Sequence, residues 1–373
     1  MRTTNGYPTG SPTKRVYRRP SPGITSNVAT AFWRWCSAAA VGALVVAGCS
    51  SPQQPESSPE VTLVRVEVPL HSPVWSYGTH TLLGLTDDHR LAKVSGAERP
   101  ETARTTLSGP LDAGRNLQIS QMDDRNVFVP QPQRGVVGIV DIGSLRPVGQ
   151  FEAGPAPNYL SEDAGMRILL ALSADGTTVT PVDQYGYRKL PTATITGDRA
   201  DSIDGSTRGR EIDYHVYAPS GIRYYKGPSS PPRERGALAM DVATSAGNNT
   251  KVTRTYVAGH DNVLYSVDSR RGGEGLEVVG SAPLPSSPVR YLGTDDTRIY
   301  AATDRQLVTL EAASFGGYPN NTINVIHVVD YRASLPAGQA KSAPLSGMEV
   351  GPHQVFLTLR GAPYVVGVAK PHL

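Results

Sequence analysis

The sequence has only two cysteines, Cys36 and Cys49, among 373 residues. It also lacks the linear motifs of several enzyme classes. It contains no Gly-x-Ser-x-Gly nucleophile elbow, His-Glu-x-x-His zinc motif, phosphate-binding loop or dinucleotide fingerprint. The eight histidines are scattered singly, and no two have the i, i+4 spacing of helical metal ligands. No long amphipathic helical stretch is present. These absences argue against a helical bundle or a doubly wound sheet, and they leave no recognisable catalytic motif.

Glycine and proline are abundant instead, with 38 and 31 residues, which favours an all-β protein with many turns. A strand–turn–strand unit recurs seven times. Its copies are Leu82–Ser95, Asn126–Asp141, Ile168–Asp183, Asp213–Lys226, Thr255–Asp268, Arg298–Glu311 and Val355–Lys370. They begin 42 to 57 residues apart, the range in which four-stranded propeller blades repeat. The sequence therefore predicts a seven-bladed β-propeller of four-stranded antiparallel blades over residues 61–373.

The two ends of this region predict how the ring closes. Val61–Leu70 alternates apolar and polar residues, as expected of a half-buried strand, but has no partner nearby in the sequence. The last repeat supplies only three strands, the third at Tyr364–Val368. Because a closed propeller leaves no long open edge, we expect Val61–Leu70 to be the outer strand of the last blade.

Two segments depart from the minimal repeat. The fourth blade, about Asp201–Arg235, is predicted to end in a loop at Gly227–Arg235, so that the fifth blade covers about Gly236–Pro283. The sixth blade carries an extra loop at Ala313–Thr322. A Val-Asp pair is expected to end the third strand in four blades, at Val140-Asp141, Val182-Asp183, Val267-Asp268 and Val329-Asp330. We interpret these aspartates as turn residues that bond the backbone, not as metal ligands.

The N-terminal region lies outside this repeat pattern. Residues 1–48 contain six basic and no acidic residues, and the apolar run Ala38–Ala47 is too short for a stable membrane span. The run ends in Val46-Ala47-Gly48-Cys49, which resembles the lipobox of bacterial lipoprotein precursors of the actinobacterial type. By this resemblance residues 1–48 are a signal peptide and Cys49 is the lipidated first residue of the mature chain. The alternative is a secretory signal that ends in a chance cysteine, and the true start of the chain could lie downstream of Met1.

Removal of residues 1–48 changes the charge. Six of the 36 Lys and Arg residues lie there, whereas all 33 acidic residues follow, so the formal charge falls from +3 to −3. The charge of the mature chain therefore gives no support for nucleic-acid binding. With Cys49 lipidated, no thiol is left for a disulfide, a nucleophile or a metal site. Residues 49–60, rich in Pro, Ser, Gln and Glu, are expected to form a disordered tether.

The third blade carries a second resemblance. Its stretch from Ala153 to Gly176 has Gly154-Pro155-Ala156-Pro157 before the inner strand and Ser173-Ala174-Asp175-Gly176 at the turn between two strands. This pattern resembles the YncE-like surface propellers, which are WD-repeat-like in architecture. The resemblance implies a propeller but no particular activity.

Candidate site residues come from the inner strands and from the turns between second and third strands. The inner strands offer aromatic residues and arginine, the residue types that carry most binding energy at recognition surfaces. The turns are expected to share one rim of the ring. The candidates for a channel or rim ligand site are Trp75, Tyr77, His89, Arg134, Tyr159, His260, Arg290, Tyr291 and Arg305. The competing interpretation is that the aromatic residues pack between blades and that the turns are merely solvated.

The sequence thus favours a monomeric binding or scaffolding propeller, anchored to the outer face of a bacterial cytoplasmic membrane and bound to an envelope protein or cell-wall partner. No cofactor is predicted. The alternative is a propeller hydrolase or lactonase with its site at the channel mouth, although no acidic or amide ligand set is recognisable on the inner strands. Fold alone cannot choose, because propellers host both classes.

Overall fold

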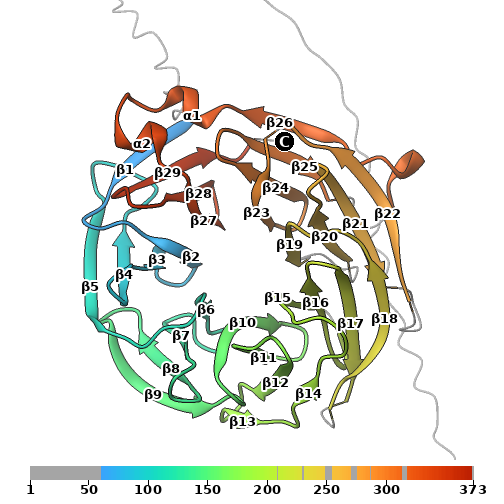
Figure 1. Cartoon of the computed structure of the whole chain (residues 1–373). Helices are drawn as coiled ribbons and strands as arrows, with labels where there is room; N and C mark the ends of the chain where they lie inside the picture. Colours follow the sequence, from blue (N-terminus) through green and yellow to red (C-terminus); the bar gives the residue numbers. More distant parts are fainter. Residues whose placement is uncertain are drawn as a thin grey trace, which may run out of the picture. The chain divides into compact units, whose positions relative to one another are not determined.

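The computed structural model describes residues 60–371 except 208, 229–230, 248–253, 270–274, 286 and 313–316. The predicted signal peptide (1–48), the lipidated Cys49 and all of the predicted tether except Glu60 lie outside the described residues. Seven antiparallel sheets surround a central channel, as Figure 1 shows. The structure confirms the predicted seven-bladed β-propeller.

Each blade has its first strand at the channel and its fourth strand at the periphery. The first blade comprises β2 (His71–Ser76), β3 (Thr81–Leu85), β4 (Arg90–Ser95) and β5 (Arg104–Pro110). The second comprises β6 (Gln118–Ile119), β7 (Asn126–Gln131), β8 (Val136–Asp141) and β9 (Arg146–Glu152). The third comprises β10 (Pro157–Asp163), β11 (Ile168–Ser173), β12 (Thr178–Asp183) and, both paired with β12, β13 (Arg188–Lys189) and β14 (Ala193–Thr194).

The fourth blade comprises β15 (Ser202–Gly205), β16 (Ile212–Ala218), β17 (Gly221–Gly227) and β18 (Arg233–Ala239). The fifth comprises β19 (Thr244–Gly247), β20 (Arg254–Ala258), β21 (Val263–Ser269) and β22 (Leu276–Pro283). The sixth comprises β23 (Val289–Thr294), β24 (Arg298–Thr303), β25 (Leu307–Glu311) and β26 (Val325–Val329). The 3-10 turn η1 (Pro319–Asn321) precedes β26, and two one-turn helices, α1 (Tyr331–Ser334) and α2 (Gln339–Ser342), follow it.

The seventh blade closes the ring with strands from both ends of the propeller. It comprises β27 (Leu345–Val350), β28 (Gln354–Leu359), β29 (Tyr364–Ala369) and, at the periphery, β1 (Val61–Arg65). Strand β1 runs antiparallel to β29, with Val61 opposite Val368 and Arg65 opposite Tyr364. The predicted closure is confirmed, but β1 ends at Arg65 and not at Leu70. The chain bends at Glu67 and Val68, between this strand and β2.

The fourth blade differs from its prediction. Residues 233–235, predicted to be loop, begin β18, which pairs with β17 through Lys226–Arg233 and Tyr225–Glu234. The predicted loop Gly227–Arg235 is therefore mostly the turn between β17 and β18, and the fifth blade starts at Thr244, not at Gly236. Residues 229–230 of this loop lie outside the described residues.

The turn aspartates follow the prediction in part. The Oδ1 atom of Asp141 accepts from the Ser144 N–H at 2.7 Å, and that of Asp183 accepts from the Tyr185 N–H at 2.9 Å. Asp268 differs, because it lies within β21, which continues to Ser269. Asp330 also differs, because Val329 ends the fourth strand and not the third. It instead caps α1 by accepting from the Ala333 N–H at 2.9 Å.

The core lies between neighbouring blades. Second strands are buried along their whole length, for example β11 and β28, because each blade packs a neighbour on both of its faces. The sequences of such strands are therefore continuous apolar runs and do not alternate between apolar and polar residues. At the channel the inner strands approach closely: a Cβ added at Gly347 would lie 2.2 Å from Pro73 Cδ. Within the described part of the chain, no helix has the length and apolar character needed to cross a membrane.

Candidate functional site: the central channel

The channel consists of two adjoining cavities of about 720 Å³ each. Tyr159, Asp204 and Glu349 line both, so the two cavities are the halves of one passage. One half opens where the inner strands begin, at residues such as Ser72 and Arg290. The other opens where the inner strands end, near Tyr77. The two mouths therefore lie on opposite rims of the ring.

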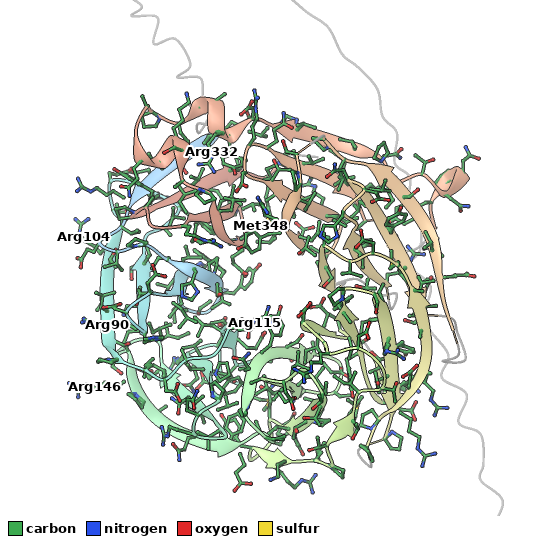
Figure 2. All side chains as sticks on the ribbon, viewed as in Figure 1. Arg90, Arg104, Arg115, Arg146, Arg332 and Met348 are labelled. Carbon is green, nitrogen blue, oxygen red and sulfur yellow. The ribbon has the colours of Figure 1, made fainter. Side chains whose placement is uncertain are left out.

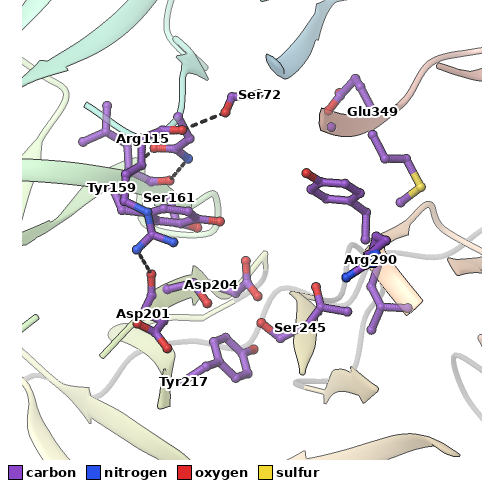
Figure 3. A pocket seen from close by; sticks show the side chains of 18 of the residues that line it. Ser72, Arg115, Tyr159, Ser161, Asp201, Asp204, Tyr217, Ser245, Arg290 and Glu349 are labelled. Atoms are coloured by element: carbon purple, nitrogen blue, oxygen red, sulfur yellow. Dashed lines mark hydrogen bonds between the residues drawn. The ribbon is translucent and has the colours of Figure 1, made fainter. Parts of the chain in front are cut away.

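The mouth at the beginning of the inner strands carries two arginines, and we call it the arginine mouth. Arg115 precedes β6 in the second blade, and Arg290 lies on β23 in the sixth. Figure 3 shows them on opposite sides of the cavity. In Figure 2 Arg115 lies inside the ring, whereas Arg104 and Arg146 lie on its periphery. A guanidinium has five N–H donors, so each arginine keeps donors beyond its bonds within the protein.

Residues of the first, third and fourth blades hold Arg115 in place. Its Nη1 donates to the Asp201 carbonyl oxygen of the fourth blade at 2.7 Å, and its guanidinium carbon lies 5.7 Å from the centre of the Tyr159 ring. Its own carbonyl oxygen accepts from the Ser72 hydroxyl at 2.7 Å. Arg290 is oriented by Asp304, whose Oδ2 lies 2.9 Å from its Nε. Both cations are thus positioned before any ligand arrives, which lowers the entropy cost of binding.

The opposite mouth is acidic, and we call it the carboxylate mouth. Among the described residues that line its half of the channel there is no Lys, Arg or His, and the five carboxyl groups belong to Glu162, Asp204, Asp295, Asp296 and Glu349. The two halves therefore differ in their cations: Arg115 and Arg290 line only the half at the arginine mouth, whereas carboxyl groups line both halves, with Asp201, Asp204 and Glu349 in the first.

Burial shifts the pKa values of the deeper carboxyl groups. It raises the pKa of Glu162 and of Glu349 to about 8, and that of Asp204 to about 7, because the charged form loses solvation. Asp295 behaves differently. Burial pushes its pKa upward, but the Thr297 N–H and Lys370, whose Nζ lies 2.9 Å from Asp295 Oδ2, outweigh that effect and lower the pKa.

The structure brings some of the predicted site residues together. Tyr159, Arg290 and Tyr291 line the half of the channel at the arginine mouth. Tyr77 lies at the carboxylate mouth, where its hydroxyl donates to the Val350 carbonyl oxygen at 3.3 Å.

Trp75 was misplaced by the sequence analysis. Its side chain is only 3% exposed and stacks on Phe356 of the last blade, with ring centres 5.1 Å apart. Trp75 therefore packs between blades and does not face the channel, as the competing interpretation expected.

The turn candidates lie on the predicted rim but outside the channel. His89, Arg134, His260 and Arg305 all occupy turns between second and third strands. Arg134 donates to Gln131 and Gln150, Arg305 pairs with Asp330 at 2.7 Å, and His260 Nδ1 lies 2.8 Å from Asp241 Oδ1. Three of these four contacts lie within one blade, and the contact of His260 reaches Asp241 in the segment that leads into the fifth blade.

Sequence reasoning missed several lining residues, chiefly Arg115, Glu162, Asp204 and Glu349. Each lies in or beside an inner strand, and that position was the only available signal. Within the described ranges, no group of three or more His, Cys, Asp or Glu side chains is placed to hold a metal ion. The hydrolase alternative therefore gains no ligand set from these residues.

Comparison with known proteins adds support for the fold. No protein family and no curated protein sequence matches the chain. Solved WD40 propellers do resemble it. U3-55K matches with a TM-score of 0.62 at 10% identity, over 83% of this chain and 98% of that one. The WD40 repeats of RRP9 match with a TM-score of 0.62 at 9% identity, over 83% and 97%. A chain of the mitotic checkpoint complex matches with a TM-score of 0.62 at 12% identity, over 89% and 100%. At these identities the likeness shows the β-propeller fold alone.

Proposed function

We propose that this chain is an extracytoplasmic lipoprotein, anchored through Cys49 to the outer face of a bacterial cytoplasmic membrane, and that its propeller binds another envelope component. The anchoring rests on the lipobox-like Val46-Ala47-Gly48-Cys49 and on the polar segment between Cys49 and the first strand. The thioether-linked diacylglycerol supplies two acyl chains, and two chains make anchoring stable where one is marginal.

The arginine mouth carries the binding proposal. Arg115 and Arg290 project from opposite blades into one polar cavity, beside Tyr159 and Tyr291. Arginine and tyrosine are enriched at the centres of protein interfaces, and guanidinium groups bind carboxylate and phosphate groups with two parallel hydrogen bonds. The partner therefore presents an acidic group to this mouth. Protein interaction is also a common use of propeller surfaces, although the fold by itself does not specify a partner.

Anchoring is tested by replacing the lipid acceptor. A bacterial host is grown with a fatty-acid probe, and the wild-type protein is expected to carry the probe and to fractionate with membranes. Cys49→Ala should lose the label and leave the lipidated pool. Undiminished labelling of the variant would show that Cys49 is not the lipidation site.

Binding is tested with two charge-matched double variants of the lipidated protein. Arg115→Ala/Arg290→Ala removes both guanidinium groups of the mouth, whereas Arg104→Ala/Arg146→Ala removes two from the periphery (Figure 2). After affinity capture from solubilised membranes, we expect the partner to be depleted at least tenfold by the first pair and retained by the second. Equal recovery with both pairs would exclude the arginine mouth as the binding surface.

A further inference from the structure

The outer edge of the sixth blade exposes an apolar strand. Val325, Ile326 and Val328 of β26 are 37–48% exposed. They make up three of the eight large hydrophobic side chains that are exposed in the described residues, and Val278 of the neighbouring strand β22 is a fourth. Strand β22 lies beside the start of β26, because Ser281 bridges to Thr322 and its carbonyl oxygen accepts from the Ile323 N–H at 2.9 Å. The exposed residues therefore cluster on one side of the ring.

The described chain also begins at this strand. The Oε1 atom of Glu60 lies 2.7 Å from Nε2 of His327, the central residue of β26. The Glu60 carbonyl oxygen accepts from the Ala369 N–H at 2.8 Å, which holds this residue at the outer edge of the last blade. In Figure 1 β1, which follows Glu60, and β26 lie toward the same side of the ring.

We propose that β26 lies against the surface of the lipid bilayer, with Val325, Ile326 and Val328 in the interfacial region. This inference rests on the proposed lipid anchor at Cys49. Eleven Cα–Cα steps separate Cys49 from Glu60, so the extended chain spans at most about 40 Å. A random coil of eleven residues averages about 20 Å from end to end. The short tether keeps β26 close to the membrane and gives the contact a high effective concentration.

The shape of β26 favours a membrane over another strand as its occupant. In its pairing with β25, Thr309 faces His327 and Leu310 faces Val325, so Ile326 forms a bulge. Bulges on edge strands disturb the regular ladder that a further strand would need. A bilayer interface requires no such register and accepts apolar side chains from an irregular edge, with an affinity that grows with the apolar area buried.

A fluorescence experiment on the intact lipidated protein tests this contact. Ile326→Cys is labelled with an environment-sensitive dye and reconstituted in vesicles of phosphatidylethanolamine and phosphatidylglycerol. Some of these lipids carry a nitroxide quencher near the headgroup. Cys49 is blocked by its thioether, so the dye attaches at position 326. The matched control is Val148→Cys on β9, an outer strand of the second blade, where the valine is 60% exposed. Figure 1 places β9 across the ring from β26.

We expect the nitroxide lipids to quench the dye at position 326 several-fold more than at position 148. Equal, weak quenching at both positions in protein that floats with the vesicles would overturn the contact while leaving the anchor intact. Failure to float would overturn the anchor, and the contact with it. Weak nitroxide quenching at 326 together with crosslinked dimers would assign the strand to a second copy and also overturn the proposal.

Discussion

Trp75 and Phe356 join the first blade to the last, at the seam where the ring closes. Their rings are stacked at an interplanar angle of 14°, and both side chains are buried. The Trp75 indole N–H is buried without a hydrogen-bond partner, so only its apolar contacts contribute to stability.

Trp75→Ala should therefore lower the free energy of unfolding by about 3–5 kcal/mol, the usual cost of deleting a buried tryptophan. Trp75→Phe should cost much less, because it keeps a stacked ring and removes the unpaired N–H. Urea unfolding of the two variants measures the difference. A loss below about 1 kcal/mol for the alanine variant would contradict the assigned packing.

Glu349 gives the channel a pH-dependent contribution to stability. Burial raises the pKa of its carboxyl group from the usual 4.5 to about 8, so the folded state keeps a proton that the unfolded state releases within this range. The free energy of unfolding therefore falls as pH rises from about 4.5 to 8. Glu162 and Asp204 act in the same direction.

Glu349→Gln cannot ionise, and it should raise the melting temperature at pH 8 by several degrees while changing little near pH 4.5. The backbone N–H of Trp75, not its indole, donates to this carboxyl group. Glutamine retains a side-chain oxygen that can accept the same hydrogen bond. Glu101→Gln, at an exposed glutamate, is the matched control. If Glu349→Gln and the wild type have the same melting temperature at pH 8, ionisation of Glu349 does not lower the free energy of unfolding.

At this scale the sequence predicted aromatic residues and arginine at the inner strands, but it missed the carboxyl groups and did not always predict which way a side chain points. Successive side chains of a strand face opposite sides, so a shift of one residue exchanges channel and core positions. The pairing of β2 with β3 contains such an irregularity between His71 and Val74, and Trp75 follows it. Pro73, which has no N–H to donate to the ladder, lies within this bulge, and the prediction for Trp75 did not take the bulge into account.

At the scale of elements, β1 determines whether the ring is closed. Val64 is fully buried opposite Val365 of β29, and Val66, just beyond the strand, is also buried. Without β1 the last blade would expose the edge of β29 together with these apolar contacts.

Deletion of residues 50–59 should therefore leave the melting temperature nearly unchanged, because Glu60 and β1 remain. Deletion of residues 50–65 should lower it strongly or prevent folding, since about 25 cal/mol is lost for each Å² of apolar surface that becomes exposed. Circular dichroism melts of the two lipidated proteins provide the comparison. Closely similar melting temperatures of the two deletion variants would mean that the pairing of β1 with β29 does not stabilise the ring.

The repeat period was predictable because every blade needs the same strand–turn–strand core. The boundaries of the blades were harder to predict, because outer strands are partly solvent-exposed and lack a strong apolar pattern. Strand β18 illustrates this: its seven residues alternate between exposed and half-buried, and its start was read as loop because prolines precede it.

At the scale of the whole molecule, the ring presents two chemically different openings on opposite rims. The arginine mouth shares its rim with the turns between second and third strands, as the contact of Arg290 with Asp304 in one such turn shows. The carboxylate mouth lies on the other rim. The difference between the two mouths arises because residues far apart in the sequence converge at the channel. Linear motifs could not reveal it, and neither mouth was foreseen as a charged unit.

The central claim is that a partner occupies the arginine mouth in the cell. The most direct measurement is photo-crosslinking in living bacteria, with a benzophenone amino acid replacing Tyr291, which lines this mouth. The control replaces Tyr185, an exposed tyrosine between β12 and β13 that does not line the channel. We predict a discrete adduct with an envelope component at position 291, lost in Arg115→Ala/Arg290→Ala, and none at position 185. Absence of any adduct at 291 while one forms at 185 would contradict the account.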